Sequence, residues 1–415
     1  RTTGSSMLKV WFAIPFWQRV LGAFAAGMLI GGLAPEVGVA LKPLGDLFIK
    51  AIKMLVAPLI FCAIVSAITD LNDGKKLGRL GVKTIGLFMF TAVIASAIGL
   101  TLATVIDISP ETVLTPTEQN EKTIPSVSEV FLNFVPDNPF ASLTEGNVLQ
   151  IVVFAALVGI AIQRLSQKAE PLRKTIKSGA EVMYEITRMV LQLTPVGVFG
   201  LMSWVIGEYG FSTLLPLAKF VGVIYLACLI HIVVVYGGLV RTAGGMSVRE
   251  FFKAVFDAQI VAFTTCSSFG SLPAAHRAVT ERLKVSKDYA SFVLPLGATI
   301  NMDGCGGIYP AVASIFIAQL YGIPLEWMDY GLIMLTATLA SVGTAGVPGT
   351  ALVMLTVTLN VIGLPLEGIA FIAAIDRIID MARTLTNVTG DMMVSRVVAR
   401  SENLLQDDST VKTES

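Results

Sequence analysis

The sequence has little charge, few histidines and few cysteines. Only 14% of the 415 residues are charged, the 30 basic and 30 acidic residues cancel, and there are two histidines and four cysteines. Because neither charge sign is in excess, nothing in the composition indicates a nucleic-acid or acidic-polymer partner. The cysteines lie in apolar segments without metal-ligand spacing, which argues against a zinc site and a disulfide framework. We interpret His231 and His276 as structural or interfacial residues and not as catalytic ones.

Apolar residues are abundant, and they define the class of protein. They make up 54% of the chain, and the mean hydropathy is +0.74. Such values are typical of a polytopic membrane protein, in which a spanning helix needs about 20 apolar residues. Six apolar runs are candidates for such helices. They are 8–33, 43–68, 84–106, 148–162, 180–206 and 214–240.

Charged residues between these runs predict the topology. The connections between the second and third runs and between the fourth and fifth are basic, which favours the cytoplasm, and connection 107–146 is mostly acidic, which favours the outside. We expect both termini in the cytoplasm and the protein in the inner (plasma) membrane. Residues 1–6 read as the remnant of an expression tag, and we recognise no cleavable signal peptide after them.

Two further apolar runs are interrupted at their centres and flanked by like charges. Run 251–275 has basic residues at both ends and a small, hydroxyl-rich centre at 264–273; run 331–365 has acidic flanks and a Gly/Pro break at 341–350. We predict two re-entrant helical hairpins of opposite orientation, each followed by a long segment with polar residues. Such an inverted repeat indicates a substrate site near the membrane midplane of a secondary transporter. The alternative is that Gly and Pro only allow close helix packing.

The last apolar segment, 366–398, carries five polar residues along one side of a helix. They are Asp376, Asp380, Arg383, Asn387 and Asp391. Ionised side chains are costly inside a bilayer, and this row holds more carboxylates than one arginine neutralises, so we expect it to face a site for cations. The alternative is a buried salt-bridge ladder within a helix bundle.

The nature of these groups suggests the ligands. Segment 297–304 places Asn301 and Asp303 among glycines in a helix expected to be unwound; with Asn387 and Asp391 they offer oxygen ligands suited to sodium. Half-helix N-termini at the hairpin tips, with Ser267 and Ser268, suit an α-carboxylate. We then expect Arg383 to grip a second carboxylate and Asp380 to receive an ammonium group, which describes aspartate or glutamate. The alternative is that Asp380 and Arg383 only pair with each other.

Four motifs resemble those of a known family, the glutamate/aspartate transporters or dicarboxylate/amino acid:cation symporters. This family includes prokaryotic homologues of the excitatory amino acid transporters, and a member of it is a well-known example of inverted repeats. The resemblance covers the chain from its first span to its last helix. The motifs are Thr265-Cys266-Ser267-Ser268, Asn301-Met302-Asp303-Gly304, Gly343-Thr344-Ala345-Gly346-Val347-Pro348-Gly349, and Asp380-Met381-Ala382-Arg383-Thr384 leading to Asn387-Val388-Thr389-Gly390-Asp391.

The resemblance implies a homotrimer of eight transmembrane helices per chain and two re-entrant hairpins, working as an elevator. The scaffold would comprise 7–79 and 147–208. The moving transport domain would comprise 80–106 and 209–400, with an extracellular loop at 107–146 and a C-terminal tail at 401–415. The second hairpin would act as the outer gate and close over bound substrate and sodium.

The resemblance also implies individual binding residues. Those for substrate are Ser267, Ser268, Cys305, Val347, Gly349, Asp380, Arg383, Thr384 and Asn387. Those for two to three co-transported sodium ions are Thr91, Gly297, Thr299, Asn301, Asp303, Ser341, Val342, Thr344, Asn387 and Asp391.

Several positions depart from the family pattern. Cys305 replaces a common Thr near the substrate side chain, Cys266 replaces an Arg of the first hairpin in some members, Ala92 replaces a second hydroxyl after Thr91, and Thr350 is bulkier than usual. Arg377 is a candidate to compensate for the Arg missing at Cys266.

We therefore predict sodium-coupled uptake of L-aspartate or L-glutamate by a protein that is not an enzyme. The rival within transport is a proton-coupled glutamate or C4-dicarboxylate symporter. An intramembrane hydrolase using Ser267 or Asp376 is a rival from another class, but neither histidine lies near a candidate nucleophile in the motifs. A channel fits two gate-like hairpins less well than alternating access does.

Overall fold

The described part of the protein is all-helical. The computed structural model describes residues 11–70, 75–110, 113–114, 132, 135–146, 148–268, 270–344 and 350–406. All regular elements in these ranges are helices, which confirms the predicted all-α class. An isolated antiparallel bridge joins Val285 to Leu405, and the Ser286 N–H donates to the Leu404 carbonyl at 2.9 Å. Residues 1–6 and most of 107–138 lie outside the described residues.

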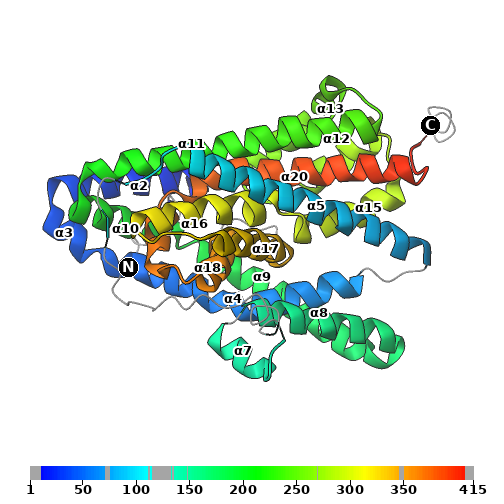
Figure 1. Ribbon diagram of the computed structural model, residues 1–415, viewed down its shortest axis with the longest axis horizontal. Helices are drawn as coiled ribbons and strands as arrows, with labels where there is room; N and C mark the ends of the chain where they lie inside the picture. The colour runs from blue at the N-terminus through cyan, green and yellow to red at the C-terminus, as the bar shows by residue number, and fades with distance from the viewer. Residues whose placement is uncertain are drawn as a thin grey trace.

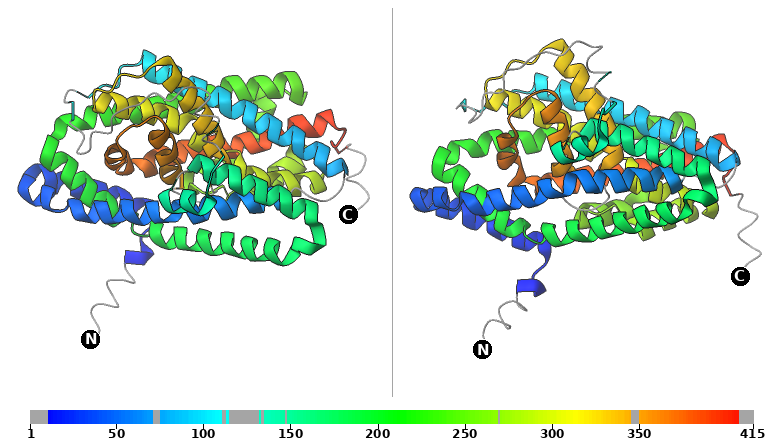
Figure 2. Two further views of the ribbon diagram at one scale, coloured as in Figure 1. Left: turned by 60° about the horizontal axis from the view of Figure 1, so that its bottom comes forward. Right: turned by 90° about the horizontal axis from the view of Figure 1, so that it is seen from below.

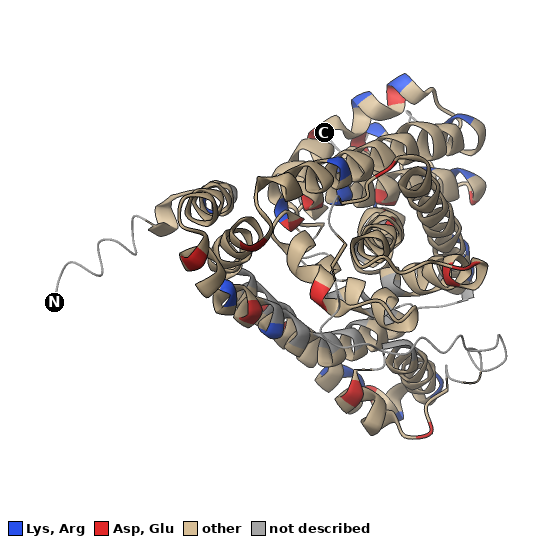
Figure 3. Cartoon of the chain, turned by 60° about the vertical axis from the view of Figure 1, so that its left-hand side comes forward, with Lys and Arg blue, Asp and Glu red and all other residues tan. Residues whose placement is uncertain are grey.

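Two stretches of helix among the described residues are long and apolar enough to cross a membrane. They are Gly78–Val105 and Phe211–Gly244. Figure 3 shows long tan stretches between the few charged residues along the chain. The count of eight spanning helices and their orientation stay predictions.

One group of helices gathers around α4. Its members are α2 (Phe16–Leu33), α3 (Pro35–Ala40), α4 (Lys42–Asp70), α8 (Val148–Leu165), α9 (Glu170–Leu191) and α10 (Thr194–Tyr209). Helix α4 packs against α8, α9 and α10, and α2 packs along α10 (Figure 1). A Cβ at Gly31 would lie 2.6 Å from the backbone oxygen of Ser203, so glycine lets α2 and α10 approach closely.

The expected span 180–206 is divided between two helices. Helix α9 ends at Leu191 and α10 begins at Thr194, with Pro195 in its first turn. Proline lacks a backbone N–H and fits the first turn of a helix, where that N–H has no partner within the helix. Sequence hydropathy alone does not detect this break, because apolar residues continue through it.

The other group surrounds the last long helix, α20. Helix α20 packs against α5, α11, α13, α15 and η6. Figure 2 shows the bundle from two further sides, in which α20 is found by its orange to red colour. The bounds are α5 (Lys75–Val105), α11 (Leu214–Ile230), η3 (His231–Tyr236), α12 (Gly237–Leu239), η4 (Val240–Gly244), α13 (Val248–Thr265), α14 (Leu272–Arg277), η5 (Ala278–Arg282), α15 (Lys287–Ile300), η6 (Asp303–Ile308), α16 (Tyr309–Leu320), α17 (Trp327–Gly343), α18 (Thr350–Val361), α19 (Ile369–Ala373) and α20 (Asp376–Ser401).

Both predicted hairpins double back on themselves. In the first, Arg282 Nη1 donates to the Lys253 carbonyl at 3.3 Å, which joins the end of η5 to the start of α13. In the second, Thr336 Oγ1 donates to Thr358 Oγ1 at 3.3 Å and joins α17 to α18. Residues 345–349 at the second tip lie outside the described residues.

Candidate functional site

The centre of the candidate site is the guanidinium of Arg383 on α20. Its side chain is fully buried and stacks over the Tyr309 ring, with Cζ 4.0 Å from the ring centroid. Nη2 donates to Asp376 Oδ1 at 2.9 Å and lies 3.3 Å from Asp380 Oδ1. Within the described residues, Nε and Nη1 have no hydrogen-bond partner. Arg383 therefore pairs with Asp380, as one alternative predicted, but also with Asp376, and two of its three nitrogens have no partner in the described part of the chain.

Asp380 is the carboxylate that the sequence predicts to bind the amine of the substrate. Its Oδ1 accepts a hydrogen bond from Thr384 Oγ1 at 3.2 Å and lies 3.9 Å from Cys305 Sγ. All three side chains are buried. The structure therefore brings Asp380, Thr384 and Cys305 together beside Arg383. In such an arrangement a carboxylate can bind an ammonium group while the neighbouring guanidinium binds a carboxylate of the same molecule.

A break in the helical path lies opposite α20. Asn301 (φ −98°, ψ 82°) and Met302 (φ −119°, ψ 59°) are non-helical between α15 and η6, as the glycines around them predict. Asn387 on α20 accepts a hydrogen bond from the Gly304 N–H at 2.8 Å, which anchors the break. A Cβ at Gly304 would lie 2.5 Å from the Arg383 carbonyl oxygen, so this approach requires glycine.

Carboxylate and amide oxygens cluster beside this break. Asn301 Nδ2 donates to Asp391 Oδ1 at 2.8 Å, while Asn301 Oδ1 and Asp303 Oδ1 are buried without a partner in the described residues. Gly297 lies so close that its Cβ would be 2.3 Å from Asp391 Oδ1. Thr91 is fully buried on the adjacent α5 and donates to the Phe88 carbonyl at 3.1 Å. Unpaired hard oxygen atoms suit a cation such as sodium.

The tip of the first hairpin begins where α13 ends. Cys266 adopts a left-handed conformation (φ 51°), which terminates the helix. Ser267 Oγ accepts a hydrogen bond from the Gly270 N–H at 2.9 Å, and Ser268 is buried. The serines predicted to bind substrate are thus part of an ordered turn.

Arg377 ties this tip to α20. Its Nη2 donates to the Thr264 carbonyl at 3.2 Å and its Nη1 to the Thr265 carbonyl at 3.4 Å. A cation at a helix C-terminus satisfies carbonyls that have no partner within the helix. Arg377 therefore places its charge at the hairpin end that Cys266 leaves neutral.

The second hairpin is described up to Thr344. Ser341 Oγ donates to the Thr338 carbonyl at 2.7 Å, and Ser341 and Thr344 are buried. A Cβ at Gly306 would lie 2.4 Å from Ser341 Cα, so α17 packs directly on η6. Val342 lies in α17 and Thr299 in α15, two helices that contact each other. The predicted substrate residues Val347 and Gly349 lie outside the described residues.

Sequence reasoning missed two partners of Asp303. His231 Nε2 lies 2.9 Å from Asp303 Oδ2, and the Tyr236 hydroxyl donates to the same oxygen at 2.6 Å. His231 is fully buried, so the interfacial interpretation is wrong and the residue is part of the buried polar cluster around Asp303. The available signal was a histidine and a tyrosine inside the apolar run 214–240, but nothing in the sequence identifies a partner 72 residues away.

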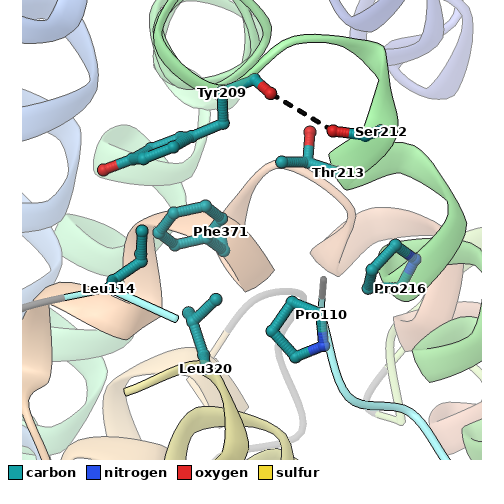
Figure 4. Close-up of a pocket in the computed structure, with 8 residues that line it drawn as sticks. All are labelled: Pro110, Leu114, Tyr209, Ser212, Thr213, Pro216, Leu320 and Phe371. Carbon is teal, nitrogen blue, oxygen red and sulfur yellow. Dashed lines mark hydrogen bonds between the residues drawn. The ribbon is translucent and has the colours of Figure 1, made fainter. Parts of the chain in front are cut away.

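A separate pocket opens near the ends of α10 and α16 (Figure 4). Its lining residues are Pro110, Leu114, Tyr209, Ser212, Thr213, Pro216, Leu320 and Phe371. None of them is charged, and Ser212 Oγ donates to the Tyr209 carbonyl at 3.3 Å. We assign the candidate site to the polar cluster around Arg383, because buried charge requires a reason and an apolar pocket does not.

Comparisons with known proteins identify the family of the chain and its relatives. A sequence model of the sodium:dicarboxylate symporter family matches residues 16–401. The chain is 35% identical over 405 residues to the proton/sodium-glutamate symport protein of Geobacillus stearothermophilus, covering 94% of this chain and 95% of that protein. It is 37% identical over 408 residues to the proton/glutamate-aspartate symporter of Escherichia coli (strain K12), covering 93% and 92%.

Proposed function

The chain belongs to the sodium:dicarboxylate symporter family, and from this premise we propose that it is a sodium-coupled symporter of acidic amino acids, L-aspartate or L-glutamate. The observation that carries the proposal is the guanidinium of Arg383: Nη2 lies 3.3 Å from Asp380 Oδ1, and Nε and Nη1 have no hydrogen-bond partner among the described residues. A guanidinium grips a carboxylate through parallel hydrogen bonds, and a nearby carboxylate favours an ammonium group. A dicarboxylic amino acid has both groups.

The coupled cation is proposed to be sodium. Asn301 Oδ1 and Asp303 Oδ1 are unpaired within the described residues and lie beside a break in the helix. A buried oxygen atom without a partner is costly in free energy, and a sodium ion could coordinate it without any hydrogen-bond donor nearby. The alternative is a proton-coupled glutamate or C4-dicarboxylate symporter, since the relatives' names include both cations.

The mechanism proposed is alternating access of the elevator type in a homotrimer. The helices around α4 would form the scaffold, and those around α20, with both hairpins, would form the transport domain. The hairpin α17–α18 would close as the outer gate. If sodium favours closure, substrate and sodium each raise the other's affinity by the same factor.

The test is a titration of purified protein with aspartate, glutamate, succinate and serine, in sodium or choline and at two pH values. Aspartate should bind tightly only in sodium. Binding that follows pH and ignores sodium would favour the proton-coupled alternative, and tight succinate binding would contradict the role of Asp380.

Two variants separate the two ends of the substrate. Asp380→Asn should weaken aspartate binding strongly but succinate binding little, because only aspartate has an amine. Arg383→Cys should abolish the preference for acidic substrates over serine. An Arg383→Cys protein that kept its full preference for acidic substrates would refute the assignment of that residue.

A further inference from the structure

The buried carboxylate of Asp303 is held at only one of its two oxygen atoms. His231 Nε2 and the Tyr236 hydroxyl both bond to Oδ2, at 2.9 and 2.6 Å, and all three side chains are fully buried. Oδ1 is equally buried and has no partner among the described residues. If the two donors served only to satisfy a buried carboxylate, they would be expected to use both oxygens, since each unsatisfied oxygen is costly.

The element that carries the two donors has an unusual geometry. His231 and Tyr236 are the first and last residues of η3, a π-helical stretch that follows α11 and is separated from a second π-helical stretch, η4, by the short α12. Their ring centroids are 4.6 Å apart, so both rings lie on the same side of the helix. Single π-helical turns are rare and frequently occur at functional sites.

The opposite helix is shaped to admit this arrangement. A Cβ at Gly390 on α20 would lie 2.6 Å from the Tyr236 hydroxyl and 3.1 Å from Asn301 Nδ2. Gly390 therefore lets Tyr236 and Asn301 lie next to each other. As a result, the two buried oxygens without partners, Asn301 Oδ1 and Asp303 Oδ1, belong to one small region.

We propose that His231 and Tyr236 are positioning residues for the coupled cation, because they fix Oδ2 of Asp303 and so present Oδ1 to that ion. The inference rests on the proposed sodium coupling. Hydrogen bonds to a ligating carboxylate fix its orientation, and their removal commonly weakens metal binding by about 10- to 100-fold. The same loss is expected here for sodium, with substrate affinity at saturating sodium unchanged.

The experiment measures sodium binding by calorimetry on the purified full-length protein without substrate. Tyr236→Phe and His231→Leu each remove one donor and should weaken sodium binding about tenfold or more. His231→Gln keeps a donor group on a side chain of similar length and should restore most of the affinity. Tyr289→Phe is the control, because it removes a buried tyrosine hydroxyl that bonds to Thr84 Oγ1 at 2.7 Å, away from this cluster.

Each outcome bears on one claim. Failure of the unmodified protein to bind sodium would refute the proposed function itself. If that protein binds sodium and both donor-removing variants bind it equally well, the positioning role is overturned. An equal loss in Tyr289→Phe, or a parallel loss of aspartate affinity at saturating sodium, would indicate a general packing effect and also overturn it. If Tyr236→Phe does not fold, the difference between His231→Leu and His231→Gln decides.

Discussion

Gly297→Ala tests the oxygen cluster by steric displacement of Asp391. The new methyl group would lie 2.3 Å from Asp391 Oδ1 and 2.6 Å from its Cγ. Both distances are far below van der Waals contact, so the carboxylate has to turn away. Turning it breaks the 2.8 Å hydrogen bond from Asn301 Nδ2 and moves the predicted sodium ligand.

The expected loss follows from that hydrogen bond. A bond to a charged group contributes about 1.5–3 kcal/mol, and about 1.4 kcal/mol corresponds to a tenfold change in affinity. Sodium binding should therefore weaken by roughly 10- to 100-fold. Alanine is a better helix former than glycine by about 1 kcal/mol, which offsets part of the steric cost in the sodium-free protein.

The assay is the sodium dependence of aspartate binding to the purified protein. Gly222→Ala in α11 is the matched control, because a Cβ there meets no atom within 4 Å. The half-saturating sodium concentration should rise in Gly297→Ala and stay unchanged in Gly222→Ala. Unaltered sodium dependence in Gly297→Ala would show that Asp391 does not bind the coupled cation.

Two further predictions concern the ends of α20. Arg377→Met removes two hydrogen bonds to the last turn of α13 and should lower aspartate affinity about tenfold in a titration at saturating sodium. The control is Arg282→Met, at the other end of the same hairpin, which should leave aspartate affinity unchanged. Equal aspartate affinities of the two variants would contradict the prediction. At the other end, hydrogen bonds from Lys83 and Arg79 lower the pKa of Glu402 below its ordinary 4.5, so the folded state is stabilised above that pH and loses this contribution as pH falls. Denaturation midpoints measured across acidic pH should show a smaller decline in Glu402→Gln than in the unmodified protein, and parallel curves would refute it.

The charged side of α20 was predictable because it depends on local spacing. Asp376, Asp380, Arg383, Asn387 and Asp391 recur every three or four residues, and all five are buried on one helix as expected. The two hairpins were predictable for a similar reason, since helix-breaking residues at each centre and matching charges at each flank are sequence-local signals.

The partners of Asp303 were not predictable from spacing. His231 and Tyr236 precede it by 72 and 67 residues, and their apolar neighbours made them resemble ordinary residues of a membrane helix. Tertiary packing chose the pairing. The π-helical turn that brings the two rings together also has no sequence signature of its own.

The short bridge after α20 affects how the protein can be handled. Leu404 and Leu405 pair with Ser286 and Val285, and the Gln406 N–H donates to the Lys284 carbonyl at 2.7 Å. A fluorescent or affinity fusion joined directly after Ser401 would delete these backbone hydrogen bonds. The linker that leads into α15 would then lose its attachment to the segment after α20. A fusion that begins after Gln406 retains it, and with it the anchorage of the helix that carries Gly297.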